Sequence, residues 1–363
     1  MINKRDSRLD TMRGILLAMM TLNHLGGQLR DFTTEPFGFV TAAEGFILLS
    51  AYTYAITSRV AQAPFASLAH TAGKRALKIY KYHMLAFALL LVVALAVPAY
   101  GDIFGPRFFG QSGSTTMAAV GAALLVHQPK FFDILPMYIV FALLSPVVLY
   151  GLRQGQGALV LLGSVALWMA GHVFDPTKAA ADALAIGASK GYFNLLSWQL
   201  LWVLGLYAGY AHKHAERRDL PRNSLLLAAC VMIVVACLMS KHGMIDVADH
   251  LLPYFDKATL GVMRLVNVIA QLTVLCALLR LVNRDSSLPW FSFIGRYSLQ
   301  VFTYHVVVVY LAVPVGWRMK TAFGPAGDVI LSLVLVASLT LPALLFRALE
   351  KRGAAPTRQP TPA

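Results

Sequence analysis

The stretch Arg13-Gly-Ile-Leu-Leu-Ala-Met-Met-Thr-Leu-Asn-His24-Leu-Gly-Gly-Gln-Leu-Arg30 decides how the rest of the chain is interpreted. It is apolar enough to enter a membrane, yet it contains the imidazole of His24. In a continuous helix the eleven steps from Arg13 to His24 place both side chains on one face, about 16 Å apart. Thr21 and Gln28 fall on that face too, three and four residues from His24. An ionisable residue inside a spanning segment is costly, so His24 is a candidate functional residue; the alternative is a histidine satisfied in a helix interface.

The composition indicates an integral membrane protein. Of the 363 residues, 58% are hydrophobic and 13% are charged, and the mean hydropathy is +0.64. A net charge of +14 would favour nucleic-acid binding in a soluble protein, but the basic residues here lie between apolar runs, so we expect no nucleic-acid partner. Cys230, Cys237 and Cys276 lie inside apolar runs without metal-ligand spacing, and we expect neither a disulfide framework nor a metal site.

Ten apolar segments are candidates for membrane spans of about 20 residues each. They are 13–31, 37–58, 79–99, 131–151, 157–174, 193–211, 223–240, 258–281, 290–313 and 327–348. Because their number is even, both termini lie on one side, and the distribution of Lys and Arg makes that side the cytoplasm. The sequence therefore predicts an all-α, polytopic membrane bundle with cytoplasmic N- and C-termini.

Residues 1–350 are predicted to form one transmembrane domain, and 351–363, rich in Pro and Thr, a disordered cytoplasmic tail. The apolar stretch 117–126 is too short to cross a membrane and is predicted to be interfacial or re-entrant on the outer side.

Three further polar residues fall within predicted spans or at their ends. Glu44 lies among small residues, where a carboxylate needs a partner. It either orients His24, as an acid does in a catalytic triad, or forms an interhelical strut to an Arg or a hydroxyl. Asp133 opens the fourth span and is either a site residue or a helix cap. His305 lies on the same face as Ser298 and is either a second acid/base group or a structural hydrogen-bonding partner.

A basic face leads into the third span, with residues repeating at spacings of three and four: Lys74, Arg75, Lys78 and Lys81. Such a flank obeys the positive-inside rule and contacts anionic lipid. Together with Arg8 and Arg13 it also suits a multiply phosphorylated ligand such as coenzyme A, because clustered Arg and Lys neutralise phosphates. Both interpretations stay open from the residues alone.

Several distinctive short stretches of sequence follow one another from the first predicted span to the ninth. They are Arg8-Leu-Asp-Thr-Met-Arg-Gly14, Asn23-His24, Ala43-Glu-Gly-Phe-Ile-Leu-Leu-Ser50, Asp133-Ile-Leu-Pro136, Trp198-Gln199 followed by Gly205, Asp256-Lys-Ala-Thr-Leu-Gly261 with Arg264, and Gly295-Arg-Tyr-Ser-Leu299. Together they resemble the OpgC family, whose namesakes succinylate osmoregulated periplasmic glucans. The chain is also similar to acyltransferase family 3, whose signature of an Arg, ten residues and a His matches Arg13 and His24.

The resemblance implies a multi-pass O-acyltransferase of a bacterial inner membrane that moves an acyl group, succinyl or acetyl, from cytoplasmic acyl-CoA to hydroxyls of a periplasmic glycan. His24 would be the general base or an acyl carrier, assisted by Glu44, with Asn23 stabilising the oxyanion. The residues implied to hold the nucleotide phosphates of the acyl-CoA are Arg8, Arg13, Lys74, Arg75 and Lys78. Those implied to contact the acceptor glycan are Asp133, Trp198, Gln199, Asp256, Lys257 and Arg264.

Two other classes of protein compete with this interpretation. A transporter or flippase of an acyl or glycan carrier would use the buried ionisable groups for proton coupling. In a structural membrane subunit, substitutions of Arg13, His24 or Glu44 would lower abundance rather than activity. The expected partners are acyl-CoA, the glycan and membrane lipid, without a metal, and the sequence is compatible with a homo-oligomer.

Overall fold

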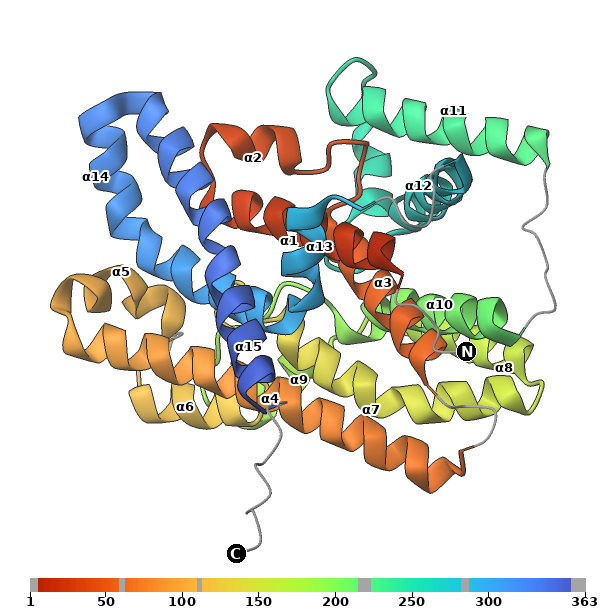
Figure 1. Cartoon of the computed structure of the whole chain (residues 1–363), viewed down its shortest axis with the longest axis horizontal. Helices are drawn as coiled ribbons and strands as arrows, with labels where there is room; N and C mark the ends of the chain where they lie inside the picture. Colours follow the sequence, from red (N-terminus) through yellow and green to blue (C-terminus); the bar gives the residue numbers. More distant parts are fainter. Residues whose placement is uncertain (1–5, 59–62, 110–112, 215–222, 282–286, 354–363) are drawn as a thin grey trace, which may run out of the picture.

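The computed structural model describes residues 6–58, 63–109, 113–214, 223–281 and 287–353, which contain only helices and connecting segments (Figure 1). The elements within these ranges are α1 (Ser7–Leu25), α2 (Gln28–Thr33), α3 (Ala42–Thr57), α4 (Phe65–Ala96), α5 (Pro98–Phe108), α6 (Thr115–Ala123), α7 (Ile134–Arg153), α8 (Gly157–Ala170), α9 (Pro176–Ala183), α10 (Leu195–His214), α11 (Ser224–Lys241), the 3-10 helix η1 (Asp249–Phe255), α12 (Val262–Leu281), α13 (Pro289–Arg296), α14 (Ser298–Ser338) and α15 (Thr340–Gly353). The prediction of an all-helical chain is confirmed.

Five helical segments of the described chain are long and apolar enough to cross a membrane, which suggests a membrane protein. They are α4, α7, α11, α12 and the stretch Ser298–Arg352 that joins α14 to α15. Each of the ten predicted spans overlaps a helix, although α8, with 14 residues, is short for a crossing. The ten spans, the cytoplasmic termini and the interfacial role of 117–126, which falls largely on α6, stay predictions.

The predicted ends of two segments differ from the structure. The first span was expected to continue to residue 31, but α1 ends at Leu25, because Gly26 and Gly27 adopt φ values of 77° and 74° that favour glycine and break the helix. His24 therefore lies in the last turn of α1, and Gln28 begins a different helix instead of sharing its face. Residues 351–353, expected in the disordered tail, are the last residues of α15, and 354–363 lie outside the described residues.

Close backbone crossings hold the centre of the fold together. A Cβ atom on Gly14 would lie 2.0 Å from the carbonyl oxygen of Phe291, and one on Gly295 would lie 1.9 Å from that of Asp10. Only glycine permits this approach of α1 to α13, which lie together in the middle of Figure 1. Because α13 leads directly into α14, the crossing also brings the first half of α14 against α1.

Candidate functional site

Two histidines, one from α1 and one from α14, form the centre of the candidate site. His24 Nδ1 lies 3.1 Å from His305 Nε2, within hydrogen-bond distance. The side chain of His305 is fully buried, and its Nδ1 lies 2.5 Å from the carbonyl oxygen of Phe302 in the preceding turn of α14. Of the two roles predicted for His305, its contacts match that of a structural hydrogen-bonding partner. The side chain that it contacts is His24.

This network assigns the protons on both rings. A carbonyl oxygen only accepts hydrogen bonds, so His305 Nδ1 carries a hydrogen. Burial favours the neutral imidazole, and His305 Nε2 then has a lone pair that accepts a hydrogen bond from His24 Nδ1–H. In the neutral form of His24, the remaining nitrogen, Nε2, is therefore unprotonated, which is the state that a general base requires.

Phe131 fixes the orientation of the His24 ring from one side. The two rings stack with centroids 3.9 Å apart and an interplanar angle of 19°. Phe131 has a φ of 73°, an unfavourable conformation for a bulky residue that the surrounding structure must maintain. The Tyr310 hydroxyl of α14 supports it by donating to the carbonyl oxygen of the adjacent Lys130 over 2.7 Å.

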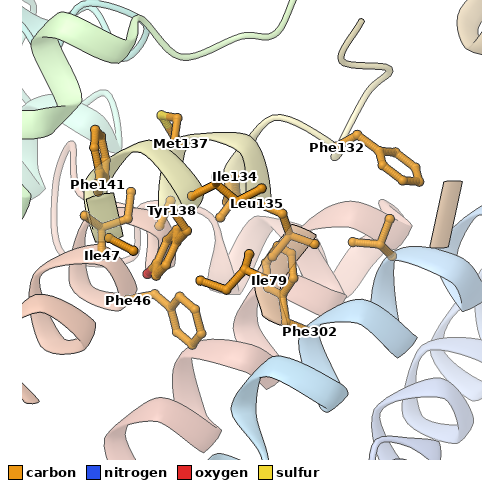
Figure 2. Packing of buried hydrophobic residues seen from close by; sticks show 14 of the residues in the cluster. Phe46, Ile47, Ile79, Phe132, Ile134, Leu135, Met137, Tyr138, Phe141 and Phe302 are labelled. Atoms are coloured by element: carbon orange, nitrogen blue, oxygen red, sulfur yellow. The ribbon is translucent and has the colours of Figure 1, made fainter. Parts of the chain in front are cut away.

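A first cavity, which we call the basic cavity, has a volume of about 290 Å³ and lies among α1, α3, α4, α7 and the start of α14. Its lining combines three cations, two serines and a group of apolar and aromatic side chains: Arg13, Arg75, Lys78, Ser50, Ser298, Phe46, Ile79, Ile134, Leu135, Tyr138, Leu299 and Phe302. Figure 2 shows the apolar members converging from α3, α4, α7 and α14. The hydroxyl of Tyr138 is buried in this lining near the side chain of Ser50.

A second cavity, which we call the histidine cavity, has a volume of about 240 Å³ and lies between the end of α1 and two parts of α14. His24, Gly26 and Gly27 line it from one side, and residues from Val309 to Ser332 line it from the other. Since His24 Nδ1 is occupied by His305, Nε2 is the ring nitrogen available to a molecule in this cavity.

The histidine pair lies between the two cavities. Along α14, Ser298, Leu299 and Phe302 line the basic cavity, His305 follows one turn later, and the lining of the histidine cavity begins at Val309. The Phe302 ring, which is 1% exposed, lies 4.7 Å from the His305 ring between their centroids. Phe302 therefore separates the basic cavity from the histidines.

Comparison with known families shows to which family the chain belongs. A family model described as OpgC protein matches residues 5–351, nearly the entire sequence. The chain belongs to the OpgC family. This membership confirms the predicted resemblance and suggests a glucan-modifying transferase, whereas the relationship to acyltransferase family 3 stays a prediction. Comparisons with curated proteins and with solved structures found no match.

In this OpgC-family chain, the predicted pairing of Glu44 with His24 is wrong. Glu44 Oε1 accepts a hydrogen bond from Arg264 Nε over 2.6 Å, and Oε2 accepts one from the Thr41 backbone N–H over 2.9 Å. The second contact belongs to a capping box that holds the carboxylate at the start of α3. The spacing Thr41-x-x-Glu44 is the sequence signal of that box, and the alternative of an interhelical strut to an Arg is confirmed.

Asn23, the predicted oxyanion donor, ties α1 to α2. Its Nδ2 donates to the Thr33 carbonyl oxygen over 3.2 Å, and its Oδ1 accepts hydrogen bonds from the hydroxyls of Thr33 and Thr34 over 2.5 and 3.0 Å. These bonds fix the turn that follows His24.

The predicted phosphate-binding residues are only partly brought together. Arg13, Arg75 and Lys78 line the basic cavity, whereas Lys74 and Arg8 do not. Lys74 precedes Arg75 by one residue and so points about 100° away around α4. Arg8 forms an ion pair with Asp6 over 2.9 Å and donates to the Leu279 carbonyl oxygen over 3.1 Å.

The six residues expected to contact the acceptor lie outside both cavities, and their bonds stabilise connecting segments. Trp198 Nε1 donates to the Lys257 carbonyl oxygen over 3.0 Å, and Lys257 Nζ lies 5.5 Å from the ring centroid of Phe193. Gln199 exchanges hydrogen bonds with Ser164 over 2.8 Å. These contacts hold the segment before α12 against α10, and α10 against α8.

The two acidic members of that set also have protein partners. Asp133 accepts a hydrogen bond from the Tyr192 backbone N–H over 3.2 Å. Asp256 accepts two from Thr259, over 2.7 Å from the N–H and 2.6 Å from the hydroxyl. Burial opposes ionisation of Asp256, but the Thr259 hydrogen bonds outweigh it and hold the pKa of this carboxyl below its usual range. Among the described residues, no group of three or more His, Cys, Asp or Glu is placed to hold a metal ion.

Arg264 is the most constrained of the predicted acceptor residues. It is 2% exposed and bridges Glu44 to Glu35, whose carboxylate lies 2.7 Å from Arg264 Nη2 and also pairs with Lys241. Arg264 Nη1 donates to the Phe255 carbonyl oxygen over 3.3 Å. The bridge joins α3 and α12 to the segment between α2 and α3, so Arg264 acts as a structural residue.

Replacing Arg264 with Met is expected to destabilise the protein by about 3–5 kcal/mol, because it leaves two carboxylates without their buried partner. Thermal unfolding of the purified protein in detergent measures this loss. The matched control is Arg296→Met, which removes an ion pair to Glu350 at 3.8 Å whose side chains are more than half exposed and should change stability by less than about 1 kcal/mol. If the Arg264→Met protein unfolds at the same temperature as the Arg296→Met control, the stabilising role of the bridge is contradicted.

Proposed function

We propose that this chain is an inner-membrane O-acyltransferase that moves an acyl group, such as succinyl, from cytoplasmic acyl-CoA to hydroxyls of a periplasmic glycan such as an osmoregulated periplasmic glucan. The observation that carries the proposal is the histidine pair between two cavities, in a chain of the OpgC family. Acyl-CoA is made in the cytoplasm and the glycan is outside, so the reaction has to connect two compartments. With a cytoplasmic N-terminus, the Arg13 end of α1 faces the donor and the His24 end faces the acceptor.

The chemistry follows from the state of His24. Its Nε2 takes the proton from the acceptor hydroxyl while the hydroxyl oxygen attacks the thioester carbonyl, so a C–O bond forms and the C–S bond then breaks. The departing sulfur of coenzyme A receives the proton from the same nitrogen. His305 accepts the Nδ1–H bond throughout and keeps the ring oriented. In the alternative order, His24 Nε2 attacks the thioester carbonyl and the C–S bond breaks to release the thiolate of coenzyme A. The hydroxyl oxygen then attacks the acyl-histidine, the C–N bond breaks, and the hydroxyl proton passes to the thiolate.

The basic cavity suits the donor. Arg13, Arg75 and Lys78 supply positive charge for phosphates, and the first turn of α14 begins at Ser298 in the same lining, where free backbone N–H groups favour anions. The aromatic members offer apolar surface to the pantetheine arm, and the Tyr138 and Ser50 hydroxyls add polar groups. A thioester that advances from this cavity meets Phe302, so the proposal requires this ring to shift when the donor binds.

Replacing His24 with Ala is expected to reduce acyl transfer by about 100- to 10,000-fold, because a positioned base contributes a rate factor of that size. Mass spectrometry of cell-envelope glycans, from cells with the protein, without it and with the variant, measures the added acyl mass and identifies its carrier. The variant is compared at equal membrane abundance. Near-normal acylation by the variant would remove His24 from the mechanism, and proton-driven transport without consumption of acyl-CoA would favour a transporter.

The role of His305 is tested by two replacements. His305→Leu removes the acceptor for His24 Nδ1–H, so the proton is free to occupy Nε2, and transfer should fall by about 10- to 100-fold, the range for lost partners of an orienting imidazole. His305→Gln keeps an acceptor oxygen near the same position and should retain more of the rate, with a pH profile closer to that of the unaltered protein. Equal rates and equal pH profiles for the two variants would contradict the tautomer assignment.

The donor site is tested with neighbouring residues of α4. Arg75→Gln should raise the KM for acyl-CoA about tenfold with little change in kcat, because a charge-assisted contact of roughly 1.4 kcal/mol is lost. Lys74→Gln is the matched control, since Lys74 lies outside the cavity lining, and should leave the KM unchanged. Kinetics in membrane vesicles provide both constants. Equal effects of the two substitutions would indicate a lipid-contacting flank instead of a donor site.

A further inference from the structure

The histidine cavity contains polar and aromatic groups that the donor chemistry does not use. Besides His24, its lining includes Trp317, Lys320, Asp328 and Ser332 of α14. The Trp317 side chain is 61% exposed, and Ser332 is 4% exposed. Within the described part of the chain, the Asp328 carboxylate has no hydrogen bond or ion pair. A half-buried carboxylate and an exposed indole beside an unprotonated imidazole nitrogen point to a ligand.

A reversal of α14 brings these groups together. Gly324 has φ 58° and ψ −142°, a conformation outside the helical region, and Pro325 follows it. After the reversal, Gly327 packs so closely that a Cβ atom there would lie 2.3 Å from the Met319 carbonyl oxygen. Trp317 and Lys320 consequently lie on one arm of α14, and Asp328 and Ser332 lie on the other. The reversal of α14 lies at the upper left of Figure 1.

The turn after α1 closes the cavity next to Asp328. A Cβ atom built on Gly27 would lie 3.3 Å from Asp328 Cβ, so the carboxylate is held against the glycine turn that follows His24. The two glycines leave room in front of the imidazole that larger side chains would fill. The acidic group and the general base therefore belong to one space.

The chemistry of the lining fits a sugar ring. An indole offers a flat apolar face to the C–H side of a pyranose, and a carboxylate accepts hydrogen bonds from hydroxyls. The Lys320 ammonium and the Ser332 hydroxyl add donors. The cavity volume of about 240 Å³ is below the range of about 300–1,000 Å³ for pockets that enclose drug-sized ligands. It accommodates one ring, while the rest of a glycan stays outside.

We propose that the histidine cavity is the acceptor site, where a neutral hexose unit of the glycan stacks on Trp317 and donates hydroxyl hydrogen bonds to Asp328, so that another hydroxyl reaches His24 Nε2. This inference rests on the proposed function. It assigns acceptor recognition to the two arms of α14, and it leaves Trp198, Asp256 and Arg264 with their structural contacts.

The test uses the full-length protein in detergent and, as the probe, periplasmic glucan from the cell envelope from which all ester groups have been removed. Trp317→Ala and Asp328→Asn should each weaken glucan binding at least about tenfold in titration calorimetry without donor. In transfer assays they should raise the KM for glucan by the same factor and leave the KM for acyl-CoA unchanged. The controls are Phe323→Ala, an exposed aromatic on the same helix outside the lining, and Asp249→Asn in η1.

The outcomes separate this inference from the proposed function. Acyl transfer by the unaltered protein, with glucan binding and KM unchanged in both variants, would overturn the acceptor site and leave the transferase intact. Glucan binding that depends on Trp317 and Asp328, without acyl transfer under any condition, would support the sugar site and overturn the transferase. Loss of binding to phosphatidylglycerol vesicles, with an unchanged KM for glucan, would assign the cavity to a lipid headgroup and overturn the inference.

Discussion

The hydrogen bond between His24 and His305 depends on two helices that are far apart in the sequence but adjacent in the fold. Neither histidine can hold its position unless α14 lies against α1, and α14 starts directly after α13. The crossing of α1 and α13, where Gly14 and Gly295 each face a carbonyl oxygen of the other helix, sets that placement. Glycines at the ends of the two distinctive blocks thus serve the histidine pair through the backbone, since a single methyl group at either position would separate the helices.

Buried charge contributes a second constraint. Glu44, Arg264, Glu35 and Lys241 form a continuous chain of ion pairs that joins α3, α12 and α11 to the segment between α2 and α3. A buried pair does not add much stability over well-packed apolar residues, but removing one member is costly because the partner loses its compensation. These ion pairs therefore specify one arrangement of α3, α11 and α12, and with it the position of the segment between α2 and α3.

The sequence predicted the helical class and the family, because apolar runs and distinctive blocks are strong local signals, and its polar stripe indicated Arg13 and His24 as candidate residues. For Glu44 the sequence left two partners open, His24 and an interhelical Arg or hydroxyl, because one carboxylate suits either. In the structure the Thr41 capping box and Arg264 occupy its two oxygens. The end of α1 was misplaced although Gly26-Gly27 is a recognisable stop signal. The contributions of Trp198 and Gln199 were not predictable, because a family block shows that a residue matters without showing whether it touches a ligand or another helix. Trp317 and Asp328 lie in no such block, and only the reversal of α14 brings them near His24.

The contact between His305 Nδ1 and the Phe302 carbonyl oxygen limits where a proton can travel. A carbonyl group accepts a hydrogen bond but cannot pass a proton onward, so no proton can leave the histidine pair through His305. Any proton that His24 takes up at Nε2 must leave from the same atom. In the proposed transfer, the attacking oxygen and the departing sulfur therefore both meet His24 at Nε2, and the two rings do not conduct protons from one side of the membrane to the other.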